Sequence, residues 1–77
     1  MVTLHRYRNW KLEVFGREHG IPHVHVSGPE FDATVSIATG EVLAGTLPAA
    51  TLRDVQDWLA TNSNAAMQLW HQRNPKR

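Results

Sequence analysis

The sequence predicts a single α+β domain in which a four-stranded antiparallel sheet precedes two helices that pack on one of its faces, in the order ββββαα. Apolar and polar residues alternate through the first half of the chain, which is the period of a strand with one buried face. In the second half the apolar residues recur every three or four positions, as they do in an amphipathic helix. Because 77 residues supply only one hydrophobic core, residues 1–77 are expected to form one domain.

Turn sequences divide the first half into four expected strands. A loop at residues 16–21 follows the first strand, and the sequences Ser-Gly-Pro-Glu at 27–30 and Thr-Gly at 39–40 separate the others. Turns this short join neighbouring antiparallel strands, so the sheet is expected to be a meander. The expected strands are Trp10–Phe15, His23–Ser27, Phe31–Ile37 and Glu41–Leu47.

Two helices are expected after the sheet. Pro48 suits the first turn of a helix, because the N–H that proline lacks has no intrahelical partner there. The polar run Thr61–Asn64 is expected to end the first helix and to cap the second, which Asn74-Pro75 then stops. The apolar stripe of the first helix is Leu52, Val55, Trp58 and Leu59, and that of the second is Ala66, Met67, Leu69 and Trp70.

Strand register is expected to place one histidine between two carboxylates. If the second hairpin turns at Gly28-Pro29, His25 lies opposite Asp32 on the face away from the apolar residues. The same alternation in residues 10–15 brings Glu13 beside His25 on that face. The expected polar row is Glu13, His25 and Asp32, with His23 opposite Thr34 in the next row.

Composition excludes some classes of site. Without cysteine the chain has no disulfide, no thiolate metal site and no cysteine nucleophile. The first ten residues hold no apolar signal-peptide core, and no stretch approaches the roughly 20 apolar residues of a membrane span. We therefore expect a cytoplasmic protein without membrane contact. A metal held by histidine or carboxylate, or a homo-oligomer, remains compatible with the composition.

Basic residues gather at both ends of the chain, although the net charge is only +1. This distribution is compatible with contacts to the phosphates of RNA or DNA, and equally with solvated chain ends. Trp10, between these cations, either stacks on a base or caps the hydrophobic core. The candidate nucleic-acid contacts are Arg6, Arg8, Lys11 and Arg73.

Three histidines lie within seven residues, and His23 and His25 are two apart on an expected strand, so both point to one face. With His19 from the preceding loop they form a candidate metal-ligand set for zinc, iron or manganese. Glu13 or Asp32 then serves as the catalytic base or orients an imidazole. Binding of an anion, or a purely structural role, remains open for the same histidines.

Two longer motifs resemble domain-of-unknown-function family 4160, a family of small bacterial proteins. They read HGIPHVHV at residues 19–26 and IATGEVLAGTLP at residues 37–48, and the likeness extends from about Lys11 to His71. It includes a tryptophan in each expected helix. The positions that match the family signature are His19, Pro22, His23 and His25, whereas Gly20, Ile21 and Val24 replace the commoner Asn, Pro and Phe.

The resemblance implies no established activity. Family members often occur beside another small protein, an arrangement that resembles toxin–antitoxin pairs, so a small cognate protein is an expected partner. One hypothesis is therefore a nucleic-acid-associated or partner-binding component of such a pair. A second is a histidine-liganded, metal-dependent hydrolase. A third is a non-catalytic module that dimerises through a sheet edge or face, where Phe15 and Leu43 interrupt the polar pattern. Whether the protein is an enzyme stays open.

Overall fold

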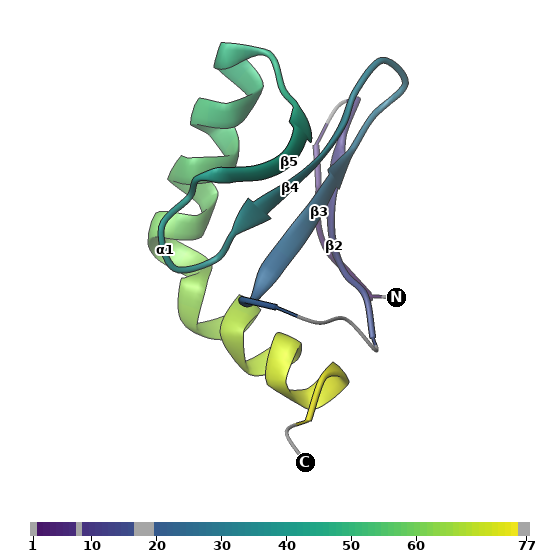
Figure 1. The fold of residues 1–77 in the computed structure, drawn as a ribbon. Coiled ribbons are helices and arrows are strands. Elements are labelled where there is room, and N and C mark those ends of the chain that lie inside the picture. Colours follow the sequence, from purple (N-terminus) through teal and green to yellow (C-terminus); the bar gives the residue numbers. More distant parts are fainter. Residues whose placement is uncertain (1, 8, 17–19, 76–77) are drawn as a thin grey trace.

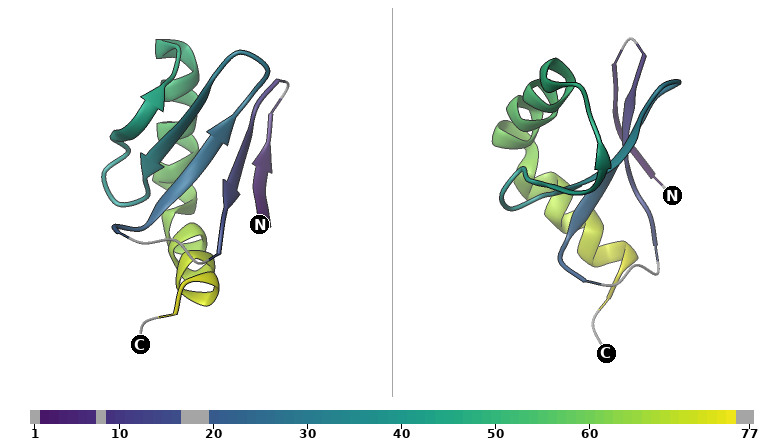
Figure 2. Two further views of the ribbon diagram at one scale, coloured as in Figure 1. Left: turned by 45° about the vertical axis from the view of Figure 1, so that its right-hand side comes forward. Right: turned by 45° about the horizontal axis from the view of Figure 1, so that its top comes forward.

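The computed structural model describes residues 2–7, 9–16 and 20–75. These residues form an antiparallel sheet with strand order β1-β2-β3-β4-β5 and one long helix that lies along one face of it (Figures 1 and 2). The predicted α+β class and the meander are confirmed. The elements are β1 (Val2–Arg6), β2 (Lys11–Val14), β3 (His23–Ser27), β4 (Asp32–Ser36), β5 (Val42–Thr46) and α1 (Ala49–Arg73).

The sheet has five strands among the described residues, so the prediction of four was wrong. The additional strand is β1, which pairs with β2 at one edge of the sheet. Its register shifts between Thr3 and His5, so Leu4 is the extra residue of a bulge. The alternation of apolar and polar residues in β1 covers only Val2–His5 and is followed by the polar Arg6, so the sequence gives only a short strand signal there.

The prediction of two helices was also wrong, because α1 runs unbroken for 25 residues through the polar run Thr61–Asn64. Asn62 Nδ2 donates to the Trp58 carbonyl at 2.9 Å, so this amide bonds back along the helix and caps no new one. The buried residues on either side of the polar run stay on one face, and their packing outweighs the low helix propensity of the run. These buried residues are Val55, Leu59, Ala66 and Trp70.

The hydrophobic core lies between the sheet and α1. Trp10 belongs to it with only 5% of its surface exposed, which favours the core-cap interpretation over base stacking. Burying each of these large apolar side chains contributes about 1.5–3 kcal/mol to folding. The sheet contributes Trp10, Leu12, Val14, Val24, Val26, Val35 and Ile37, which meet the buried residues of α1.

The register between β2 and β3 is as predicted, with Glu13 paired to His25. Between β3 and β4 the prediction was wrong by two residues, because His25 pairs with Thr34 and Asp32 pairs with Ser27. His23 accordingly pairs with Ser36 and not with Thr34.

The turn explains this shift. Gly28 N donates to Phe31 O at 3.0 Å, so the two-residue tip is Pro29-Glu30 and not Gly28-Pro29. Proline is favoured at the first tip position by its fixed φ. A Cβ on Gly28 would lie 2.7 Å from Asn9 O, so only glycine fits before the tip. Moving the tip by one residue changes every cross-strand partner by two and keeps each side chain on its predicted face.

Candidate functional site

His23 is a buried, oriented histidine at the start of β3. Its Nδ1 lies 2.8 Å from the carbonyl oxygen of Ile21, and since a carbonyl only accepts, Nδ1 carries the proton. The ring lies 4.5 Å from the Trp70 ring and 5.3 Å from the His25 ring, measured between centroids. The imidazole is therefore held in one orientation by backbone and by helix α1.

His25 is half-buried and stacks on Phe15 with a centroid distance of 4.1 Å and an interplanar angle of 28°. This contact half-buries Phe15, which the sequence pattern had suggested as an exposed apolar side chain. His19, the third candidate ligand, lies outside the described residues. Within residues 2–7, 9–16 and 20–75, no three histidine or carboxylate side chains converge on a point where they could hold a metal. The ligand set His19, His23 and His25 thus stays a prediction.

Glu13 is an unusual buried carboxylate. It is 3% exposed, and its Oε2 accepts no hydrogen bond among the described residues. Lys11 Nζ lies 3.6 Å from Oε2, on the same face of β2. A buried carboxylate whose one ion pair among the described residues is this long is energetically costly, and such costs persist where the group serves a function.

Asp32, the other candidate carboxylate, is exposed at the start of β4. It does not face His25 across the strands, yet both side chains line a hollow of about 270 Å³ together with Thr34 and Gly45. The structure therefore separates the two carboxylates by environment, since Glu13 is buried beside His25 whereas Asp32 lies at the margin of an open hollow.

The candidate nucleic-acid contacts do not form one set. Arg6 and Lys11 are directly paired across β1 and β2. Arg73 lies in the last turn of α1, where Asn74 Nδ2 donates to the Phe15 carbonyl at 3.0 Å, and thus at the opposite end of β2 from Lys11. Arg8 lies outside the described residues. Two of the four cations are therefore together, and the third is remote from them.

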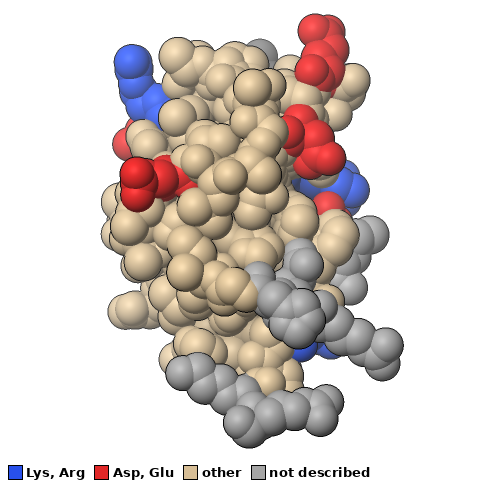
Figure 3. Space-filling model, viewed as in Figure 1, with Lys and Arg blue, Asp and Glu red and all other residues tan. Residues whose placement is uncertain are grey.

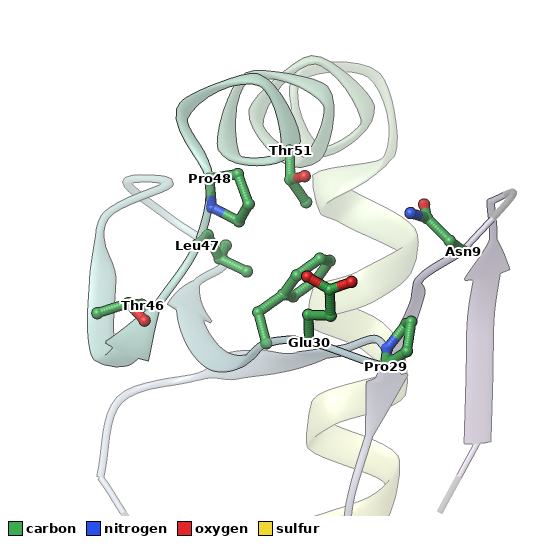
Figure 4. A pocket seen from close by; sticks show the side chains of 8 residues that line it. Asn9, Pro29, Glu30, Thr46, Leu47, Pro48 and Thr51 are labelled. Carbon is green, nitrogen blue, oxygen red and sulfur yellow. The ribbon is translucent and has the colours of Figure 1, made fainter.

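The hollow of about 450 Å³ shown in Figure 4 was not anticipated from the sequence. It opens where the start of α1, the end of β5 and the turn between β3 and β4 meet, with the Glu30 carboxylate and the Thr51 hydroxyl turned toward it. Its size is in the range of small-molecule sites, but neither His23 nor His25 lines it. Its lining residues are Asn9, Pro29, Glu30, Phe31, Thr46, Leu47, Pro48 and Thr51.

The edge strand β5 is exposed at all five residues. It pairs with β4 on one side only and contains neither a charged residue nor a proline. Leu43 is 44% exposed and Val42 36% exposed. Figure 3 shows the side of the molecule from which β5 is seen in Figure 1. Charged side chains lie around the margin of this side, and its middle is uncharged.

Comparison with known protein families gives one result. The model of the family described as Domain of unknown function (DUF4160) matches residues 10–71. The chain belongs to the DUF4160 family. The matched segment contains β2 to β5 and nearly all of α1, so it includes Glu13, the candidate histidines and the β5 edge, whereas β1 precedes it.

No curated protein and no solved structure matches the chain. In the part of the chain that the structure describes, no helix combines the length and the apolar character required to cross a membrane. The family description assigns no activity to DUF4160, so a function for this member has to be inferred from the geometry.

Proposed function

We propose that this protein is a non-catalytic, partner-binding component of a toxin–antitoxin-like pair, and that it binds a small cognate protein by adding a strand of that protein to β5. The observation that carries the proposal is the exposure of the whole of β5, an uncharged strand at the edge of the sheet. Unpaired edge strands are templates for pairing with another chain unless charge, proline or a covering element protects them.

The chemistry of β5 suits strand addition. The outward N–H and C=O groups of its backbone would provide hydrogen bonds to a partner strand, and side chains would provide specificity. Leu43 and Val42 supply apolar surface, while Ala44 and Gly45 leave room for a neighbouring backbone to approach. The register shift between Thr34 and Val35 makes Leu43 the extra residue of a bulge, which increases the local twist and limits the strand that fits.

The histidine-liganded hydrolase gains no comparable support from the described residues. His23 is engaged by the Ile21 carbonyl and Trp70, and His25 by Phe15. These contacts are those of packed side chains at the end of the sheet, so the β5 edge is the stronger basis for a function.

The test is a charge placed on the edge. Leu43→Lys would place an ammonium group against the added strand in place of an apolar side chain, so the dissociation constant for the cognate protein should rise roughly tenfold or more. Gln68→Lys adds the same charge at an exposed position of α1 and should bind like the wild type. Binding is measured by titration of purified proteins after co-expression identifies the cognate protein encoded beside this one.

Hydrogen exchange locates the contact. Amide protons of residues 42–46 should become protected in the complex. A Leu43→Lys protein that binds as tightly as wild type, or protection confined to other segments, would contradict the proposal. If two copies of this chain formed a stable complex that Leu43→Lys disrupts, the β5 edge would be a homodimer interface. A second copy of the chain, and not a cognate protein, would then pair with β5.

A further inference from the structure

A third hollow, of about 250 Å³, lies at the β1–β2 turn, on the opposite edge of the sheet from β5. Among the described residues that line it, none carries a carboxylate, and every polar side chain includes a hydrogen-bond donor. A hollow of this kind suits a ligand that accepts hydrogen bonds and carries negative charge. Its lining residues are Arg6, Tyr7, Asn9, Trp10, Lys11, Ser27 and Gly28.

The two cations of this hollow face each other across the strands. Arg6 and Lys11 are direct cross-strand partners, and like charges at such positions destabilise a sheet. Glu13 partly compensates Lys11 from 3.6 Å, but Arg6 is exposed and has no ion pair among the described residues. An anion bound between Arg6 and Lys11 would convert this repulsion into attraction.

Beside the cations lies a prepared aromatic surface. Tyr7 is 49% exposed and stacks on the buried Trp10 at a centroid distance of 5.1 Å and an angle of 27°. His5 continues the stack by packing edge-on against Trp10 at 5.9 Å and face-on against Trp58 at 5.4 Å. The Tyr7 ring is therefore supported from the core, so little conformational entropy is lost when a ligand stacks on its exposed face.

We infer that this hollow binds single-stranded nucleic acid, with a backbone phosphate between Arg6 and Lys11 and a neighbouring base on Tyr7. Cations that follow the backbone, next to an exposed aromatic ring, are the combination that single-strand binders use. An acidic peptide would use the cations and leave the Tyr7 ring without a role. The inference is independent of the proposed function, because the two surfaces lie on opposite edges of the sheet.

The experiment follows the fluorescence anisotropy of labelled single-stranded RNA and DNA, each of about eight nucleotides, a length typical of such sites. Tyr7→Leu keeps the bulk of the side chain and removes the stacking face, and should weaken binding roughly fivefold or more. Tyr7→Phe retains the ring and should bind like the wild type. Near-ultraviolet circular dichroism of each variant checks that the tryptophan packing is unchanged.

The charge is tested separately. The logarithm of the affinity should fall with the logarithm of salt concentration, and Arg6→Gln should reduce that slope by roughly 0.7, the value for one single-strand phosphate contact. Arg53→Gln removes an exposed cation from α1 and should change neither affinity nor slope. Binding of RNA or of DNA supports the inference. It is overturned by equal affinity of wild type and Tyr7→Leu, by equally tight binding of duplex, or by full competition from polyglutamate at equal charge.

Discussion

The two edges of the sheet differ in how they meet solvent. β1 ends in Arg6 and leads into an exposed tyrosine, whereas β5 consists of five exposed residues without a charge. Charge is one of the ordinary devices that prevent an edge strand from pairing with another chain. Only the β1 edge carries such a charge, which is why we assign protein binding to β5 and nucleic-acid binding to the β1 side.

The largest expected effect is on the β5 side and concerns folding. Gly45 has φ +78°, and a Cβ there would lie 2.2 Å from the Asp32 carbonyl oxygen. Gly45→Ala should therefore lower the free energy of unfolding by about 2–5 kcal/mol, through backbone strain and the clash with β4. Urea unfolding followed by tryptophan fluorescence measures the loss.

Gly20→Ala is the matched control for Gly45→Ala. Gly20 also has a positive φ, of +91°, but a Cβ added there would meet nothing within 4 Å. Only backbone strain remains there, so the expected loss is about 1–2 kcal/mol. Equal losses for the two variants would mean that the close approach of β5 to β4 contributes nothing, and that the edge is less firmly held than the geometry indicates.

An intermediate effect separates the edges functionally. Leu43→Lys should weaken binding of the cognate protein roughly tenfold and leave oligonucleotide affinity unchanged. Tyr7→Leu should do the reverse, with a loss of roughly fivefold or more for the oligonucleotide. Both ligands are titrated against both variants. If either variant weakened both kinds of binding, the two edges would not be independent surfaces.

Much of the fold was predictable because strand and helix periods are local. β2, β3 and β4 were recognised from alternation, and the pairing of Glu13 with His25 followed from placing the apolar residues of both strands on one face. β1 was missed because its alternating run, Val2–His5, is only four residues long, and its bulged pairing with β2 is a property of the folded sheet. The unbroken α1 was missed because tertiary packing, which no local pattern contains, outweighs the polar run at residues 61–64.

The candidate site was less predictable. The partner of His25 on β4 depended on whether the hairpin tip is Gly28-Pro29 or Pro29-Glu30, and both are plausible turn sequences. Base stacking, which was considered for Trp10, is assigned to Tyr7, because Trp10 is 5% exposed and Tyr7 is 49% exposed. Burial depends on the arrangement of the whole domain, so the sequence alone does not distinguish two neighbouring aromatic residues. The burial of the Glu13 carboxylate was likewise not readable from its pattern.

The smallest expected effect links the centre of the sheet to the β1 edge. Glu13→Gln removes a buried negative charge whose Oε2 accepts no hydrogen bond among the described residues. If the charge is only an energetic cost, the free energy of unfolding should rise by about 1 kcal/mol. The carboxylate lies 3.6 Å from Lys11 Nζ and partly offsets its positive charge. Its removal should therefore strengthen the attraction between Lys11 and a bound phosphate. Oligonucleotide affinity should then rise roughly twofold, as for a weak, partly exposed ion pair.

The two readouts of Glu13→Gln distinguish its possible roles. Higher stability together with tighter oligonucleotide binding would show that Glu13 restrains Lys11 and thereby tunes the charge at the β1 edge. Lower stability would show that the carboxylate stabilises the fold beside His25, and would favour a role for Glu13 in the histidine segment over a role at the β1 edge. Thr34→Val is the control, because Thr34 pairs with His25 from the other side and carries no charge, so its substitution should leave oligonucleotide affinity unchanged.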